Sequence, residues 1–235
     1  MPKLLIDGDI VTFRAAFSAE DEEEAWIPCS RADNIIEEMK DVLGTKEVVV
    51  FLSGKNNFRY GVFPEYKANR INAKRPKWEL EVKQYLAQQY PHEISDGCEA
   101  DDLLGINQQE DTIICTIDKD LDMIPGWHYN FVKKEKYFVT PEEAIRFFYY
   151  QCLIGDAADG IKGAPNIGPI KAKRILDSCE TEEDGTPIEQ RYNRAVKQFY
   201  ASQEHFLMTA QCLWIWRKPN DIWKDPYEES MDTST

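Results

Sequence analysis

Four groups of acidic residues stand where buried elements are predicted to begin or end, which makes them candidates for metal chemistry. Carboxylate oxygens without histidine or cysteine are the ligands that magnesium and manganese prefer. Two such ions about 4 Å apart would activate a water molecule and stabilise the leaving oxygen of a phosphodiester. The groups are Asp7 with Asp9, Glu99 with Asp101 and Asp102, Asp118 with Asp120 and Asp122, and Asp156 with Asp159.

Each group also has a structural interpretation. Asp102 could cap a helix, Asp122 could be a plain surface residue, and Asp156 and Asp159 could be loop acids. Four groups that each fall at the predicted end of an element are hard to explain as independent accidents. A calcium site is a further alternative, but the loop spacing of an EF-hand is absent.

The acids must be positioned by strands and helices that alternate along the chain. Apolar runs predict buried strands at 3–7, 47–52 and 112–117, with shorter candidates at 129–132 and 137–139. Helical patterns cover 10–17, 33–43, 78–90 and 101–107, and another helix begins at Pro141. This alternation predicts an α/β fold with a mostly parallel central sheet flanked by helices. Ligands of such sheets bind beyond the carboxyl ends of the strands, where Asp7 and Asp118 lie.

The chain of 235 residues divides into three predicted parts. Residues 1–150 form the α/β domain with the acidic site, and about 55–98 form an inserted arch segment. Residues 151–218 form a helical DNA-binding region, interrupted by glycines and prolines between Gly160 and Pro169. Residues 219–235 form an acidic tail that we expect to be flexible.

Composition excludes several classes of protein. Hydrophobic residues make up 43% of the chain, and no apolar run approaches the roughly 18 residues of a membrane span. No signal peptide is expected, because the N-terminus turns acidic at Asp7. The six scattered cysteines form no CxxC pair, so we expect reduced thiols in a cytoplasmic protein and no structural zinc site.

The net charge of −14 argues against a nucleic-acid partner, but two stretches reverse the local balance. The first runs from 55 to 83 and interleaves lysines and arginines with aromatic residues that could stack on bases. The second, from 160 to 174, combines glycines that let a backbone approach phosphate with a helix start at Pro169. A solvated loop and an ordinary turn are the alternatives. The candidate DNA contacts are Arg59, Tyr66, Lys74, Arg75, Lys162, Gly163, Gly168, Lys171, Lys173 and Arg174.

Five segments in order resemble the 5′ nuclease family, which includes flap endonucleases, bacterial polymerase 5′-nuclease domains and phage 5′→3′ exonucleases. The likeness is greatest to phage exonucleases of the T-seven type, which share the DGD start, the YKANR run and the DKD strand end. Together the segments cover most of residues 3–178. They are LLIDGDIVTFRAAF (4–17), FRYGVFPEYKANR (58–70), GCEADDLLG (97–105), CTIDKDLDMIP (115–125) and LIGDAADGIKGAPNIGPIKAKRIL (153–176).

The resemblance implies a helical arch, a helix–three-turn–helix region and a set of functional residues. Arg14, Lys67 and Arg70 match basic positions that contact the scissile phosphate or orient the 5′ end. The 160–168 segment matches one that grips duplex DNA through a bound potassium ion. The implied ligands of two Mg²⁺ or Mn²⁺ ions are Asp7, Glu99, Asp101, Asp102, Asp118, Asp120, Asp156 and Asp159, with Asp9 as a less certain addition.

One departure concerns the residue after the second strand, where the family commonly carries an aspartate. Ser53 follows this strand here, and no acid stands between Phe51 and Tyr60. Either one metal is held less tightly or Asp9 compensates.

We therefore expect a metal-dependent 5′→3′ exonuclease or structure-specific 5′ nuclease that serves phage DNA replication, recombination or primer removal in the host cytoplasm. Its partners would be duplex or flap DNA, an RNA–DNA hybrid and a replication protein reached through the acidic tail. Two alternatives stay open. One is a PIN-like ribonuclease, which would not need the 153–176 grip, and the other is a catalytically weak DNA-binding protein.

Overall fold

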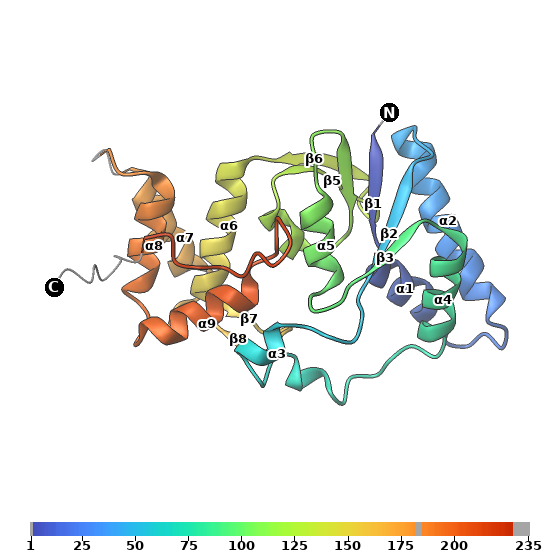
Figure 1. The fold of residues 1–235 in the computed structure, drawn as a ribbon, viewed down its shortest axis with the longest axis horizontal. Helices are drawn as coiled ribbons and strands as arrows, with labels where there is room; N and C mark the ends of the chain where they lie inside the picture. The colour runs from blue at the N-terminus through green and yellow to red at the C-terminus, as the bar shows by residue number, and fades with distance from the viewer. Residues whose placement is uncertain (1, 182–184, 228–235) are drawn as a thin grey trace. The chain divides into compact units, whose positions relative to one another are not determined.

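The computed structural model describes residues 2–181 and 185–227. Its contacts divide the chain into two units (Figure 1). Unit 1 contains residues up to 58, 72–143 and 215–221, and unit 2 contains 59–71, 144–214 and the chain from 222 onward. The division differs from the predicted boundary at 150, because residues 59–71 of the predicted arch segment group with the C-terminal helices. Part of the acidic tail, 228–235, and the acids 182–184 lie outside the described residues.

Unit 1 is built on a six-stranded sheet whose order is β3-β2-β1-β4-β5-β6. The central strand β1 pairs in parallel with β2 and β4, and only the β5–β6 edge is antiparallel. The predicted sheet, mainly parallel and flanked by helices, is therefore confirmed. The strands are β1 (Lys3–Asp7), β2 (Val48–Leu52), β3 (His92–Ile94), β4 (Thr112–Cys115), β5 (Gly126–Asn130) and β6 (Glu135–Val139).

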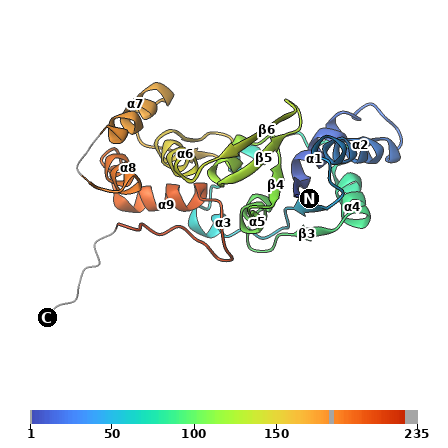
Figure 2. The ribbon, with the colours of Figure 1, turned by 90° about the horizontal axis from the view of Figure 1, so that it is seen from above.

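Helices cover both faces of this sheet, as Figure 2 shows. Three helices, α1 (Gly8–Phe17), α2 (Trp26–Leu43) and α4 (Glu79–Gln89), share a core with Leu4 and Ile6 of β1. The intervening Leu5 faces the other side, where α5 (Ala100–Asn107) lies against β1 and β2. This alternation follows from the two-residue period of a strand, and burial of both faces explains why β1 is apolar throughout.

A close backbone approach joins the start of α1 to β2. A Cβ atom on Gly8 would lie 2.5 Å from the carbonyl oxygen of Phe51. Only glycine allows this approach, which brings the carboxyl ends of β1 and β2 together.

Unit 2 contains most of α6 and all of the later helices. A short hairpin, β7 with β8, connects α6 to α7, and α9 packs on that hairpin and on α3. Proline opens both α6 and α7, as predicted. The elements are α3 (Arg59–Val62), a 3₁₀ turn (Ala68–Arg70), α6 (Pro141–Ile154), β7 (Gly155–Asp156), β8 (Ile161–Lys162), α7 (Pro169–Glu180), α8 (Ile188–Lys197) and α9 (Gln203–Leu213).

The segment predicted to form an arch contains α3, the 3₁₀ turn and α4, and residues 71–78 between them carry no helix. Its first part belongs to unit 2 and its last part to unit 1. The described beginning of the acidic tail is packed, since Trp223 is 5% exposed and its ring contacts Phe148 and Phe206. The flexibility expected of residues 219–235 stays a prediction. No helix in the described ranges has the length and apolar character that a membrane crossing requires.

Candidate functional site

Asp7 lies at the carboxyl end of the central strand β1 and is only 1% exposed. Its carboxylate accepts hydrogen bonds from the backbone amide of Ile10, at 3.0 Å, and from the Thr116 hydroxyl, at 2.7 Å. Burial is the main cause that raises the pKa of Asp7 to about 7; the two hydrogen bonds oppose it, and the nearby charges of Asp9 and Asp118 add to it. Three predicted ligands thus repel one another at the carboxyl ends of β1 and β4.

Asp118 and Asp120 are held in the 3₁₀ turn (Lys119–Met123) that follows β4. The Asp118 carboxylate caps this turn by accepting from the backbone amide of Asp120 at 2.9 Å. The Asp120 carboxylate is paired at 2.8 Å with Lys119, whose side chain is exposed. An exposed ion pair of this kind contributes little and exchanges readily.

Glu99, Asp101 and Asp102 surround the start of α5. Glu99 and Asp102 form a capping box, in which Asp102 Oδ2 accepts from the Glu99 amide at 2.9 Å. Asp102 is fully buried, and its Oδ1 accepts from the backbone amide of Trp216 at 3.0 Å. The interpretation of Asp102 as a helix cap is therefore confirmed, and its role as a metal ligand stays a prediction.

Asp9 contacts the position where the expected aspartate is missing. Both of its carboxylate oxygens accept from the Ser53 amide, at 3.2 and 3.1 Å. The Ser53 hydroxyl accepts from the amide of Ala100 at 3.0 Å, which ties the end of β2 to the start of α5. Lys83 of α4 completes this group through Asp9, at 3.4 Å.

Unit 1 therefore brings seven predicted ligands to the carboxyl edge of the sheet and the start of α5. They lie at strand or helix ends, where acids and exposed backbone amides meet. Within each unit, and among the described residues, no three acidic, histidine or cysteine side chains lie close enough to hold a metal ion between them.

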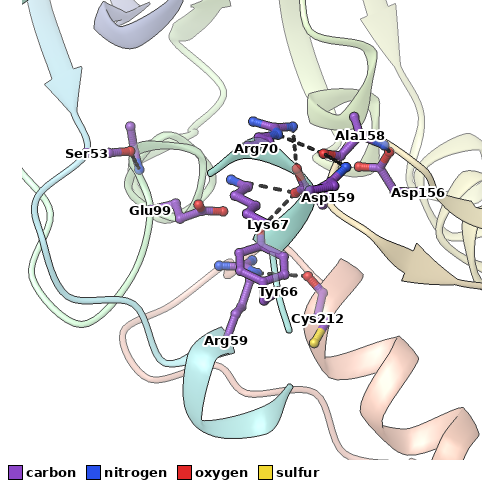
Figure 3. Close-up of polar contacts among 12 residues, drawn as sticks. Ser53, Arg59, Tyr66, Lys67, Arg70, Glu99, Asp156, Ala158, Asp159 and Cys212 are labelled. Atoms are coloured by element: carbon purple, nitrogen blue, oxygen red, sulfur yellow. Dashed lines mark hydrogen bonds and ion pairs between the residues drawn. The ribbon is translucent and has the colours of Figure 1, made fainter. Parts of the chain in front are cut away.

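In unit 2, Asp159 is surrounded by cations (Figure 3). Lys67 Nζ lies 3.6 Å from its carboxylate, Arg70 donates to the same group, and the Tyr66 hydroxyl donates at 2.8 Å. Arg70 Nε also donates to the carbonyl of Ala158 at 2.7 Å. Two residues predicted to be catalytic are thus bound to a predicted metal ligand, an association that the sequence did not reveal.

The backbone supports this arrangement. Lys67 has a φ of +56°, a left-handed conformation unusual for lysine, and its amide donates to the carbonyl of Asp159 at 2.9 Å. Asp156 instead accepts from the amide of Ala158, at 2.8 Å, within its own turn. Asp156 and Asp159 stay predicted ligands, and their spacing belongs to a hairpin and turn rather than to a helix.

Two predicted DNA contacts are buried. Arg59 is 2% exposed and donates to the carbonyls of Cys212 and Trp214, both at 2.8 Å (Figure 3). It therefore binds the C-terminal end of α9, where a cation complements the helix dipole. Tyr66 is also 2% exposed, so its ring is not available for stacking on a base.

The two other candidate DNA contacts of the first stretch, Lys74 and Arg75, are exposed. Lys74 pairs with Glu20 at 2.5 Å and Arg75 pairs with Glu79 at 2.8 Å, both at the surface. Arg14 is exposed on α1 and lines an open groove together with Phe13, Phe17 and Ile117. Ile117 is the residue that precedes Asp118 in the sequence.

The glycines of the second stretch serve different purposes. A Cβ atom on Gly163 would lie 2.3 Å from the amide nitrogen of Gly155, so this glycine permits the β7–β8 hairpin. Gly168 has open space around it and precedes α7, whose Lys171, Lys173 and Arg174 are exposed, as is Lys162. The Gly168 end stays a predicted anion grip, and Gly163 has a packing role.

Comparison with known proteins gives the family. Residues 2–146 match the model described as the 5′-3′ exonuclease, N-terminal resolvase-like domain. Because this match covers more than half of the chain, the chain belongs to the 5′-3′ exonuclease family. The predicted resemblance and the predicted class of enzyme, a nuclease that hydrolyses phosphodiesters, are thereby confirmed.

Relatives along most of the chain agree with this assignment. The 5′-3′ exonuclease of Buchnera aphidicola (subsp. Acyrthosiphon pisum) is 28% identical over 83% of this chain and 75% of its own length. The exonuclease of Escherichia phage T7 is 27% identical over 81% of this chain and 72% of its own. DNA polymerase I of Bacillus subtilis is 26% identical over 77% of this chain but only 24% of its own.

A similar fold occurs in a flap endonuclease of bacteriophage T5, solved as a complex with DNA and metal ions. Its TM-score is 0.63 at 18% identity, with 88% of each chain covered. At this identity the likeness shows the fold.

Proposed function

We propose that this protein is a metal-dependent 5′→3′ nuclease that hydrolyses DNA phosphodiesters near 5′ ends and leaves 5′-phosphates on its products. The single observation that carries this proposal is Asp7, a buried carboxylate at the carboxyl edge of a parallel sheet whose pKa is raised by burial and by the charges of Asp9 and Asp118. A divalent cation would relieve that repulsion, and the all-oxygen donor set fits magnesium or manganese.

The proposed ligands in unit 1 are Asp7, Glu99, Asp101, Asp118 and Asp120, and Asp156 and Asp159 are proposed ligands in unit 2. When bound, two Mg²⁺ ions would activate the attacking water and stabilise the leaving oxygen. Thr116 fixes the Asp7 carboxylate, and the capping contact fixes Asp118, so both keep their orientation before substrate arrives.

Lys67 and Arg70 are proposed to contact the scissile phosphate, with Arg14 orienting the 5′ end. Arg70 is half exposed and Lys67 is partly exposed, so both can exchange Asp159 for a phosphate oxygen. The guanidinium of an arginine binds two phosphate oxygens at once, so Arg70 is suited to holding the scissile phosphate in one orientation.

The start of α7 is proposed to hold the duplex backbone. Gly168 leaves the N-terminal amides of this helix accessible, and Lys171 and Lys173 add positive charge beside them. Such contacts fix the position of a duplex without reading its sequence. A potassium ion in the 160–168 segment is part of the same proposal, supported by the resemblance of that segment.

The test compares cleavage of 5′-labelled and 3′-labelled DNA in magnesium, with EDTA as the metal-free reference. Blunt, nicked and flap duplexes, an RNA–DNA hybrid and RNA are offered to the wild type and to Asp118→Asn. Asp111→Asn is the matched control, because Asp111 precedes β4 and Asp118 follows it. We expect short products from the 5′ label with the wild type and the control, and none with Asp118→Asn.

Each of the other outcomes would indicate a different function for this protein. Cleavage of RNA alone would point to a PIN-like ribonuclease. Binding of DNA without cleavage, in magnesium or manganese, would point to a catalytically weak DNA-binding protein and refute the proposal.

Three expectations stay predictions: an RNA–DNA hybrid as substrate, a replication protein as partner of the acidic tail, and a cytoplasmic location. The hybrid is tested in the same assay. The tail partner requires a pull-down with and without residues 228–235.

A further inference from the structure

The carboxyl ends of three neighbouring strands carry different charges. Acids stand at the ends of β1 and β4, as Asp7 and Asp118, whereas β2 is followed by the uncharged Ser53. At the β2 end an ammonium, from Lys83 of α4, approaches together with the Asp9 carboxylate.

Lys83 is held at this place by two contacts. Its Nζ donates to the carbonyl oxygen of Ser53 at 2.5 Å and lies 3.4 Å from Asp9 Oδ1. Asp9 in turn accepts from the Ser53 amide through both oxygens. The ammonium thus bridges a backbone carbonyl and a carboxylate, which are both oxygen ligands that a hard cation would use.

The position of Lys83 is set by the core. Its neighbours on α4, Val82 and Leu86, are fully buried and pack in the same core as Leu52 of β2. The Lys83 side chain itself is 28% exposed. A helix anchored on both sides of a lysine directs its stem to one place, unlike a surface lysine on a mobile loop.

We infer that Lys83 is a positioning residue that supplies a built-in cation at the β2 end of the acidic edge, where it stands in for part of the divalent charge. Its fixed charge repels a divalent ion from Asp9 and confines metal binding to the Asp7 and Asp118 side. This inference rests on the proposed metal site.

The test is titration of the full-length, DNA-free protein with Mn²⁺, followed by electron paramagnetic resonance or calorimetry. Lys83→Gln removes the charge and keeps a donor for the Ser53 carbonyl, so the fold is retained. We expect Lys83→Gln to bind Mn²⁺ about tenfold more tightly, or to bind one more ion, because a repulsive unit charge is removed. Lys83→Arg keeps the charge and should match the wild type.

Lys46→Gln is the matched control, since Lys46 is exposed before β2 and Lys83 reaches the end of the same strand. It changes the net charge equally and should leave Mn²⁺ binding unchanged. Equal or weaker binding by Lys83→Gln, while the wild type binds Mn²⁺, would overturn the role of Lys83 alone. Absence of Mn²⁺ binding in all variants would instead refute the metal site itself.

Discussion

The surroundings of the acids differ between the two units. In unit 1, Asp7 is surrounded by hydrogen-bond donors and by the like charges of Asp9 and Asp118. In unit 2, the single carboxylate of Asp159 is bound by Lys67, Arg70 and Tyr66. The first arrangement places like charges beside the Asp7 carboxylate and is suited to a metal ion. The second places cations around the Asp159 carboxylate, and a phosphate could take the place of that carboxylate.

Asp7→Asn removes a buried carboxylate of unit 1 and has the largest expected effect on activity. Magnesium-dependent cleavage should fall about a thousandfold, because a metal ligand is removed while the fold is kept. Initial rates on a 5′-labelled nicked duplex measure the loss. Asp111→Asn should retain activity, and a loss below tenfold for Asp7→Asn would remove Asp7 from the site.

Arg59→Met tests whether buried charge in unit 2 is structural. The variant leaves the carbonyls of Cys212 and Trp214 without their donor, so the free energy of unfolding should fall by about 3 kcal/mol. Urea denaturation followed by circular dichroism gives the value. Arg75→Gln, at an exposed pair, should change it by less than about 1 kcal/mol. Equal effects of the two changes would contradict the structural role of Arg59.

Arg70→Gln tests the unit 2 side of the comparison, because it removes one of the two cations beside Asp159. We expect kcat to fall about a hundredfold, because a phosphate contact in the transition state is lost. Arg75→Gln should weaken DNA binding and its salt dependence but leave kcat unchanged. Single-turnover rates at saturating protein separate these effects, and an unchanged rate for Arg70→Gln would exclude Arg70 from the reaction.

The raised pKa of Asp7 predicts a pH dependence of stability in EDTA. Because the folded pKa of about 7 exceeds the ordinary value, the folded state holds a proton that the unfolded state has lost between about pH 4 and 7. Stability of the metal-free protein should therefore fall as pH rises from 5 to 7, by on the order of 2 kcal/mol from this group. Thermal denaturation of the wild type and Asp7→Asn at both pH values measures it. A dependence that Asp7→Asn does not flatten would contradict the assignment.

The sequence predicted those parts of the site that depend on local order. Asp7 and Asp118 follow apolar runs, so their place at strand ends could be inferred from periodicity. Pro141 and Pro169 similarly marked the starts of α6 and α7.

Contacts between distant segments could not be predicted in this way. Arg59 and Arg70 belong to the same basic stretch, yet one is buried against residues more than 150 positions away and the other is half exposed. Composition does not distinguish a basic residue that caps a helix from one that faces solvent. The contact between Lys83 and Asp9 spans 74 residues, and the packing of α4 on α1 and β2 creates it.

Anomalous diffraction from crystals soaked in Mn²⁺ tests the central claim most directly, because it places the ion without relying on activity. We predict a peak bounded by the carboxylates of Asp7 and Asp118 in the wild type, absent from Asp7→Asn. Peaks confined to other acids, with none beside Asp7, would contradict the account.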